Sequence, residues 1–208
     1  MILIGQYDSP FVRRVGIALT LYGMAFEHRP WSAFGDSARI KHFNPLLRVP
    51  TLVLASGETL IESTYILDYL DSLAAPDLVM LPASEPERRQ ALKVISLATG
   101  AADKAVSLFY ELRLHNAVSD LFVDRCRAQI TAVMDTLTMD HAGRISPYWF
   151  GDRISHADVA VAAMLRFISE AHPGLVTMTD YAALSAHAAQ MEALPVFQAI
   201  SQPFVFSG

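Results

Sequence analysis

The chain has 208 residues, of which 52% are hydrophobic and 18% charged, and this balance excludes a disordered chain. The formal net charge is −5 and the basic residues are scattered, which argues against a nucleic-acid partner. The single cysteine, Cys126, excludes an intramolecular disulfide and a multi-cysteine metal site. No signal-peptide pattern and no apolar run of about 20 residues is present, so the sequence predicts a soluble cytoplasmic protein.

The first third of the chain alternates strand and helix signals. A short apolar run is followed by apolar residues at helical spacing, and Gly23 stands where a glycine ends many helices. Two later apolar runs are joined by the turn-forming sequence "ASGE". The order is therefore βαβ, a loop, then ββα. The predicted elements are strand 1–5, helix 10–22, strand 26–31, strands 49–54 and 58–63, and helix 65–73.

Prolines 76, 82 and 86 mark a linker, because proline removes backbone donors and fixes an extended path. Beyond this linker nearly every segment has helical spacing, with two long amphipathic helices over 86–113 and 119–142. The sequence "PYWFGDR" interrupts this pattern, and three shorter helical segments follow. The predicted division is an α/β domain over 1–76, a linker over 77–86 and an all-helical domain over 87–208.

Ser9 and Pro10 stand where the strand pattern gives way to the helical one. Serine is a preferred N-cap and proline is favoured in the first helical turn, so this pair predicts a helix start. The same junction exposes backbone N–H groups and the positive end of the helix dipole. Together with a serine hydroxyl, these groups would stabilise a thiolate and lower the pKa of its thiol. Local sequence leaves both roles open.

Pro50 opens a predicted strand, in the sequence "RVPTLV". If the Val49–Pro50 bond is cis, the N–H and C=O groups of Val49 turn outward, where an extended peptide ligand could pair with them. The general statistics of X–Pro bonds favour the trans form instead.

Glu62 and Ser63 stand at the entry to the next predicted helix. Ser63 could cap this helix, and Glu62 could interact with its dipole. Alternatively, Ser63 could bind a ligand carboxylate while Glu62 accepts a hydrogen bond from a ligand ammonium group. A ligand with both groups on one carbon is an amino-acid terminus.

Ser155 and Asp158 have the spacing of a capping box, and Ile154 and Val159 occupy the positions of a hydrophobic staple. The helix that follows, "ADVAVAAMLRF", is almost entirely apolar. We therefore predict a role for this motif in folding, not in catalysis.

In this order and spacing, the motifs together resemble the cytosolic glutathione S-transferase family, including bacterial members with a serine-type N-terminal motif. The resemblance covers essentially the whole chain through "SPFVRRV", "NPLLRVPTLV", "ESTYILDYL", the proline-bearing linker and "ISHADVAVA". It implies a thioredoxin-like N-terminal domain followed by an all-helical C-terminal bundle domain. It also implies a homodimer.

The resemblance assigns glutathione-binding roles to five residues besides Ser9. Pro50 would be the cis-proline of the family, and Val49 would pair its backbone with the cysteinyl unit of glutathione. Glu62 and Ser63 would hold the γ-glutamyl end, and Arg48 would lie near the glycyl carboxylate. The implied cofactor is glutathione as a co-substrate, with no metal.

By the same resemblance, Ser9 would stabilise the glutathione thiolate. A serine cannot attack a disulfide, so serine in place of cysteine favours conjugation over disulfide exchange. Tyr7 is the alternative, since other subclasses use a tyrosine near the end of the first strand and strand alternation would place Tyr7 and Ser9 on one side. We favour Ser9 because it stands at the helix start.

The implied activity is the conjugation of glutathione to small hydrophobic electrophiles, as in detoxification. Glutathione-dependent isomerisation, dehalogenation or peroxide reduction would use the same thiolate. A non-catalytic binding protein of the stringent-starvation type is a further alternative, although it would not need a complete set of glutathione-binding residues. The candidates for the electrophile pocket, which in the family lies between the domains, are Tyr7, Phe11, Trp31, Phe109 and Tyr110.

Overall fold

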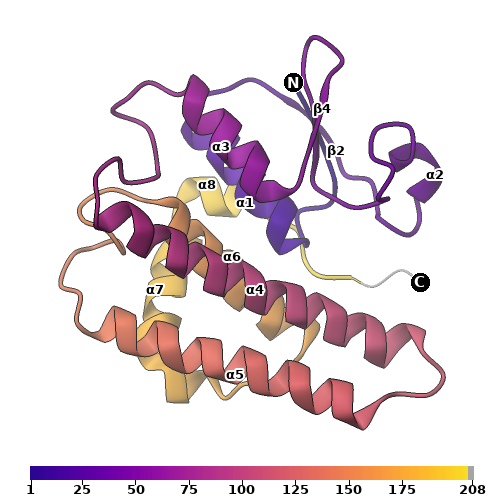
Figure 1. Ribbon diagram of the computed structural model, residues 1–208, viewed down its shortest axis with the longest axis vertical. Helices are drawn as coiled ribbons and strands as arrows, with labels where there is room; N and C mark the ends of the chain where they lie inside the picture. Colours follow the sequence, from indigo (N-terminus) through magenta and orange to yellow (C-terminus); the bar gives the residue numbers. More distant parts are fainter. Residues whose placement is uncertain (206–208) are drawn as a thin grey trace. The chain divides into compact units, whose positions relative to one another are not determined.

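The computed structural model describes residues 1–205, and these form two compact units (Figure 1). The first unit contains Met1–Met80 together with the segment from Leu194, and the second contains Leu81–Ala193. None of the helices within residues 1–205 combines the length and the apolar character that crossing a membrane requires.

The first unit contains a four-stranded mixed sheet in the order β2-β1-β3-β4. β1 pairs with β2 in parallel, and the other two pairs are antiparallel. The two central strands carry the fully buried residues Leu3, Ile4 and Leu52, which explains their apolar sequence. The predicted order of strands along the chain is thereby confirmed. The strands are β1 (Ile2–Ile4), β2 (Glu27–Arg29), β3 (Thr51–Val53) and β4 (Thr59–Ile61).

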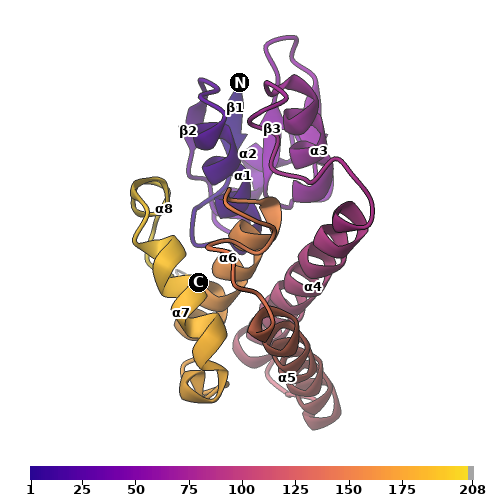
Figure 2. The same cartoon turned by 90° about the vertical axis from the view of Figure 1, so that its left-hand side faces the viewer.

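Helices cover both faces of this sheet. α1 (Pro10–Leu21) and α3 (Ser63–Leu73) lie side by side on one face, and α2 (Ser37–Ile40) lies on the other (Figures 1 and 2). Ile40 of α2 packs with Ile4 and Val53 in a buried cluster. The sequence predicted a loop in place of α2, because a four-residue helix is too short to show periodicity.

The segment from Leu194 differs from the predicted division, which assigned all of 87–208 to the helical domain. Its helix, α8 (Pro195–Ala199), packs on α1 within the first unit. The buried guanidinium of Arg13 donates to the carbonyl oxygens of Ile200 (2.9 Å) and Phe197 (3.0 Å). These bonds hold the segment, because a buried arginine requires acceptors and two backbone carbonyls supply them.

The second unit is helical. α6 is buried along nearly its whole length and lies between α4 and α7 (Figure 2). This arrangement explains the almost uninterrupted apolar sequence of α6. The two long helices agree with the predicted ranges within one residue at each end. The helices are α4 (Glu87–Leu114), α5 (Asp120–Ala142), α6 (His156–Ala171), the 3₁₀ helix η1 (Met178–Tyr181) and α7 (Ala182–Glu192).

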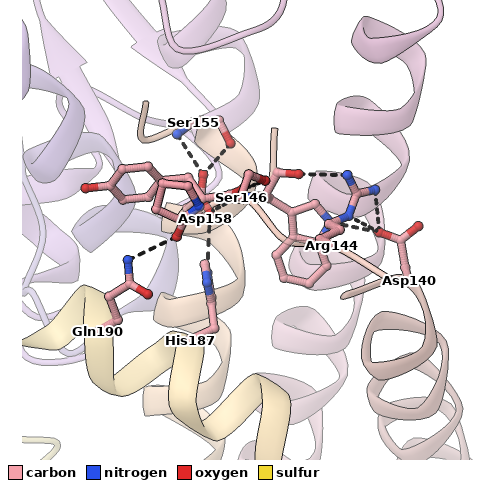
Figure 3. A network of polar contacts seen from close by, with 10 residues as sticks. Asp140, Arg144, Ser146, Ser155, Asp158, His187 and Gln190 are labelled. Atoms are coloured by element: carbon pink, nitrogen blue, oxygen red, sulfur yellow. Dashed lines mark hydrogen bonds and ion pairs between the residues drawn. The ribbon is translucent and has the colours of Figure 1, made fainter. Parts of the chain in front are cut away.

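The predicted capping box at the start of α6 is confirmed. The N–H and hydroxyl groups of Ser155 donate to Oδ2 of Asp158 at 2.8 and 2.6 Å, and the N–H of Trp149 donates to Oδ1 at 2.8 Å. His187 of α7 approaches Oδ1 at 3.5 Å, and Arg144 donates to the carbonyl oxygen of Trp149 at 2.7 Å (Figure 3). Since the Asp158 carboxylate is fully buried, this network fixes the chain segment between α5 and α6.

Candidate functional site

Ser9 caps α1 as predicted. Its backbone is extended, and its Oγ accepts a hydrogen bond from the N–H of Val12 at 3.4 Å. The side chain is only partly buried. Within residues 1–205 the proton of the Ser9 hydroxyl has no acceptor, so the hydroxyl can still donate to an anion at the positive end of α1.

Gly5 brings the start of α1 close to the loop that carries Val49. Its φ is +129°, and a Cβ atom at Gly5 would lie 2.5 Å from Cγ2 of Val12 and 2.8 Å from Cβ of Val49. Only glycine allows these two segments to approach so closely. The helix start at Ser9 and the backbone of Val49 are therefore held on neighbouring parts of the first unit.

The Val49–Pro50 peptide bond is cis, as the family resemblance implied and against the general preference of X–Pro bonds. Within residues 1–205, the N–H and C=O groups of Val49 make no hydrogen bond. Val49 is only partly buried. Both backbone groups therefore remain available to a ligand.

Asn44 holds the loop before this cis-proline, a role that the sequence analysis missed. The side chain is 1% exposed, and its Nδ2 donates to the carbonyl oxygen of Arg48 at 2.9 Å and to Oγ1 of Thr51 at 3.1 Å. Its Oδ1 accepts from the N–H of Leu46 at 2.9 Å. The only sequence signal was the Asn-Pro pair, which is also common in ordinary turns.

Glu62 has a strained backbone at the entry to α3. Its φ is +67°, in a region that non-glycine residues rarely occupy and that costs about 1–3 kcal/mol. Nη1 of Arg48 lies 3.5 Å from Oε1 of Glu62. Strain of this kind is concentrated at ligand-binding sites, and here it presents a carboxylate next to the first residue of α3, Ser63, which is 3% exposed.

Arg14 of α1 lies behind Ser63, and the sequence analysis assigned it no role. Its side chain is 2% exposed, and Nη1 donates to Oγ of Ser63 at 3.4 Å. Within residues 1–205 this guanidinium has no carboxylate partner, and its Nε has no hydrogen-bond partner. Burial lowers the pKa of Arg14 to about 10, so the group stays charged at neutral pH. The available signal was two adjacent arginines in an apolar helix.

Tyr7 packs inside the first unit. Its ring stacks on His28 with centroids 3.8 Å apart, and burial raises the pKa of its hydroxyl to about 12. The prediction that strand alternation places Tyr7 and Ser9 on one side is wrong, because the chain is not extended here but forms a turn. In this turn the N–H of Ser9 donates to the carbonyl oxygen of Gln6 at 3.2 Å. This geometry favours Ser9 over Tyr7 as the group beside a thiolate.

The other candidates for the electrophile pocket lie on different elements. Trp31 packs against Phe43 and the buried cluster of Ile4, Ile40 and Val53. Phe11 lies in the first turn of α1 and is partly buried, whereas Phe109 and Tyr110 belong to α4 in the second unit. The pocket built from these residues stays a prediction.

Two histidines of the helical unit have hydrogen-bonded structural roles. His115 donates to Glu111 at 2.7 Å, and Nε2 of His172 donates to the carbonyl oxygen of Ala105 at 2.8 Å. Cys126 is 1% exposed and burial raises the pKa of its thiol, so this side chain serves as a small buried hydrophobic group. No group of three or more metal-ligating side chains occurs in the part of the chain that the structure describes.

Comparisons with known proteins agree with this arrangement. The model of the glutathione S-transferase N-terminal domain matches residues 3–78, and that of the C-terminal domain matches residues 121–190. The uncharacterized GST-like protein YibF of Escherichia coli K12 is 34% identical over 139 residues, which cover 66% of this chain and 68% of YibF.

Two solved structures resemble the whole chain. A glutathione S-transferase of Methylobacterium radiotolerans JCM 2831, in complex with glutathione sulfonate, has a TM-score of 0.89 and 26% identity, covering 100% of this chain and 98% of that protein. A glutathione transferase family member of Pseudomonas fluorescens Pf-5, with bound glutathione, has a TM-score of 0.83 and 27% identity, covering 98% and 99%. The chain therefore belongs to the cytosolic glutathione S-transferase family.

Proposed function

We propose that the chain is a glutathione transferase that conjugates reduced glutathione to small hydrophobic electrophiles through a thiolate stabilised by Ser9. The observation that carries this proposal is the buried, positively charged Arg14 bonded to Ser63 without a carboxylate partner in residues 1–205. A buried charge of this kind requires an anion nearby. The relatives from Methylobacterium and Pseudomonas that were crystallised with glutathione sulfonate and glutathione indicate which anion.

In this proposal, the γ-glutamyl end of glutathione binds at the start of α3. Its carboxylate accepts hydrogen bonds from the hydroxyl and N–H groups of Ser63, and Arg14 and the positive end of α3 stabilise its charge. Its ammonium group donates to Glu62. Arg48, whose side chain is 56% exposed, holds the glycyl carboxylate while it keeps its ion pair with Glu62.

The cysteinyl unit pairs with the free backbone groups of Val49, next to Pro50, and this pairing directs its sulfur toward Ser9. When glutathione binds, the thiol proton leaves to solvent, and the Ser9 hydroxyl donates to the resulting thiolate. The thiolate then attacks an electrophilic carbon. A carbon–sulfur bond forms, and in an aryl or alkyl halide the carbon–halogen bond breaks and halide departs with its electron pair.

Two measurements test this proposal. Calorimetric titration with reduced glutathione should show binding below millimolar concentration, and a panel of electrophiles that includes 1-chloro-2,4-dinitrobenzene should show conjugation. Ser9→Ala should raise the pKa of the bound thiol and lower kcat about 100-fold while the Kd for glutathione stays within about threefold. Tyr7→Phe is the matched control and should leave the pKa of the thiol unchanged. If Tyr7→Phe shifts that pKa and Ser9→Ala does not, the assignment to Ser9 is wrong.

We also propose that the protein acts in the cytoplasm as a homodimer with a role in detoxification, as the family resemblance implied. A dimer is the commonest closed assembly of soluble proteins. Light scattering at micromolar concentration should give twice the mass of the chain. A monomeric mass would contradict the dimer without affecting the proposed glutathione site.

A further inference from the structure

The turn between β1 and α1 carries Ser9, and the hydrogen bond inside this turn is long. The N–H of Ser9 donates to the carbonyl oxygen of Gln6 at 3.2 Å, the upper end of the normal range. A hydroxyl that must meet a thiolate tolerates little displacement, since a misplacement of about 1 Å can lower a rate about 100-fold. The position of Ser9 therefore depends on contacts of the turn with other segments.

Strand β2 holds the chain where it enters this turn. The N–H of Gly5 donates to the carbonyl oxygen of Arg29 at 2.9 Å, and Nε2 of His28 lies 2.8 Å from the carbonyl oxygen of Gly5. Because a carbonyl oxygen only accepts, Nε2 of His28 carries the hydrogen and donates it. Both backbone polar groups of Gly5 are thus bonded to β2, and this fixes the direction in which the chain enters the turn.

The ring of Tyr7 holds the turn itself. It stacks on the imidazole of His28, with ring centroids 3.8 Å apart and planes 11° apart. It also lies against α1, because a Cβ atom at Gly16 would be 2.8 Å from Cε1 of Tyr7. Tyr7 is 8% exposed, so its ring packs against β2 and α1 at once. His28 therefore contacts the Ser9 turn twice, through a backbone carbonyl and through a side chain.

The segment after α8 contacts the same tyrosine and belongs to the same unit. The N–H of Tyr7 donates to Oε1 of Gln202 at 3.4 Å. Ile200 packs beside it, because a Cβ atom at Gly16 would lie 2.9 Å from Cγ2 of Ile200. These contacts leave the phenol ring in a closely packed site, and burial raises the pKa of its hydroxyl to about 12.

We propose that His28 is a positioning residue for the conjugation reaction, and that it acts through Gly5 and the ring of Tyr7 to hold the Ser9 hydroxyl toward the glutathione sulfur. This inference rests on the proposed function, since the group that His28 positions is the one proposed to stabilise the thiolate. It gives Tyr7 a role that depends on its ring and not on its hydroxyl. Tyr7→Leu should therefore impair conjugation, whereas Tyr7→Phe should not.

The test measures three quantities in the full-length protein: the pKa of the bound glutathione thiol, kcat for 1-chloro-2,4-dinitrobenzene and the Kd for glutathione. His28→Ala should raise the pKa of the thiol and lower kcat about tenfold, while the Kd stays within about threefold. His28→Gln keeps an N–H donor and should retain kcat within about threefold of the wild type. His42→Ala is the matched control, because His42 is an exposed histidine of the same unit, and it should leave all three quantities unchanged. If His28→Ala does not fold in urea titrations, His28→Phe replaces it, since phenylalanine keeps a ring and lacks the donor.

The double variant Ser9→Ala/His28→Ala separates positioning of Ser9 from a general effect on folding. If His28 acts through Ser9, its substitution should change kcat less than about twofold once the Ser9 hydroxyl is absent. The inference is overturned if Ser9→Ala raises the pKa of the thiol and His28→Ala does not, or if the two losses in kcat multiply in the double variant. A failure of the proposed function is distinguishable, because Ser9→Ala alone would then leave that pKa unchanged, and a role of His28 through Ser9 would be refuted with it.

Discussion

Replacing Arg14 with methionine removes the buried charge behind Ser63 while it keeps most of the side-chain volume. Nη1 of Arg14 lies 3.4 Å from Oγ of Ser63, and a carboxylate bonded to that hydroxyl would place its oxygen within about 6 Å of the guanidinium. At an effective dielectric constant of about 20, two unit charges at this separation attract by about 3 kcal/mol. Arg14→Met should therefore raise the Kd for glutathione about 100-fold.

The stability of the ligand-free protein should change in the opposite direction. An unpaired buried guanidinium destabilises the fold, so a well-packed methionine should leave the free energy of unfolding unchanged or increase it. Urea denaturation measures this effect, and calorimetry measures Kd for glutathione and for cysteinylglycine, which lacks the γ-glutamyl carboxylate. Arg14→Met should weaken binding of glutathione and leave that of cysteinylglycine nearly unchanged.

Two control variants separate this role from a general effect on packing. Arg14→Lys keeps a positive charge and should lose less than about tenfold in glutathione affinity. Arg13→Met removes the neighbouring buried arginine, which is bonded to carbonyl oxygens of the α8 segment, and should lower stability without discriminating between the two ligands. Equal losses of affinity for glutathione and cysteinylglycine in Arg14→Met would refute the electrostatic role of Arg14.

Three further predictions follow from buried polar groups. Asp158→Asn removes the charged acceptor of Ser155 and Trp149 and should lower the free energy of unfolding by about 3 kcal/mol, measured by urea titration. A change below about 1 kcal/mol would contradict the structural role of this network. Asn44→Ala removes the hydrogen bonds that hold the loop before the cis-proline, so it should lower the free energy of unfolding by about 2 kcal/mol. It should also weaken glutathione binding, measured by calorimetry. Unchanged binding would show that the loop keeps its position without Asn44. Burial lowers the pKa of His172 below 6.5 in the folded state, so the unfolded chain takes up a proton first as the pH falls. The free energy of unfolding should therefore decrease below about pH 6.5, by at most about 1.4 kcal/mol per pH unit for this group. Urea titrations between pH 7.5 and 5.0 should show a shallower dependence in His172→Gln, and identical slopes would exclude His172 as a cause.

The fold could be predicted from sequence where the signal was local and repeated. Alternating strand and helix patterns gave the order of the first unit, and long runs at helical spacing gave α4 and α5 nearly to the residue. α2 was missed because four residues carry no period. The place of α8 was missed because it depends on the bonds of Arg13 to backbone carbonyls almost 190 residues away, which no local pattern shows.

In the candidate site, too, local patterns could be predicted from sequence and contacts between distant segments could not. Ser9, Pro50 and Ser63 could be proposed from sequence because each belongs to a short motif at the end of a helix or strand. The groups that hold these residues could not be proposed, since the closeness of Gly5 to Val49 and the contact of Arg14 with Ser63 arise only when segments more than 40 residues apart meet. Local motifs thus indicate where a ligand could bind. The charge expected of that ligand follows from Arg14, whose burial and contact with Ser63 no local pattern shows. A buried cation without a carboxylate is therefore a stronger argument for an anionic ligand than the helix start at Ser9, because an N-capping serine has a sufficient structural role and an unpaired guanidinium has none.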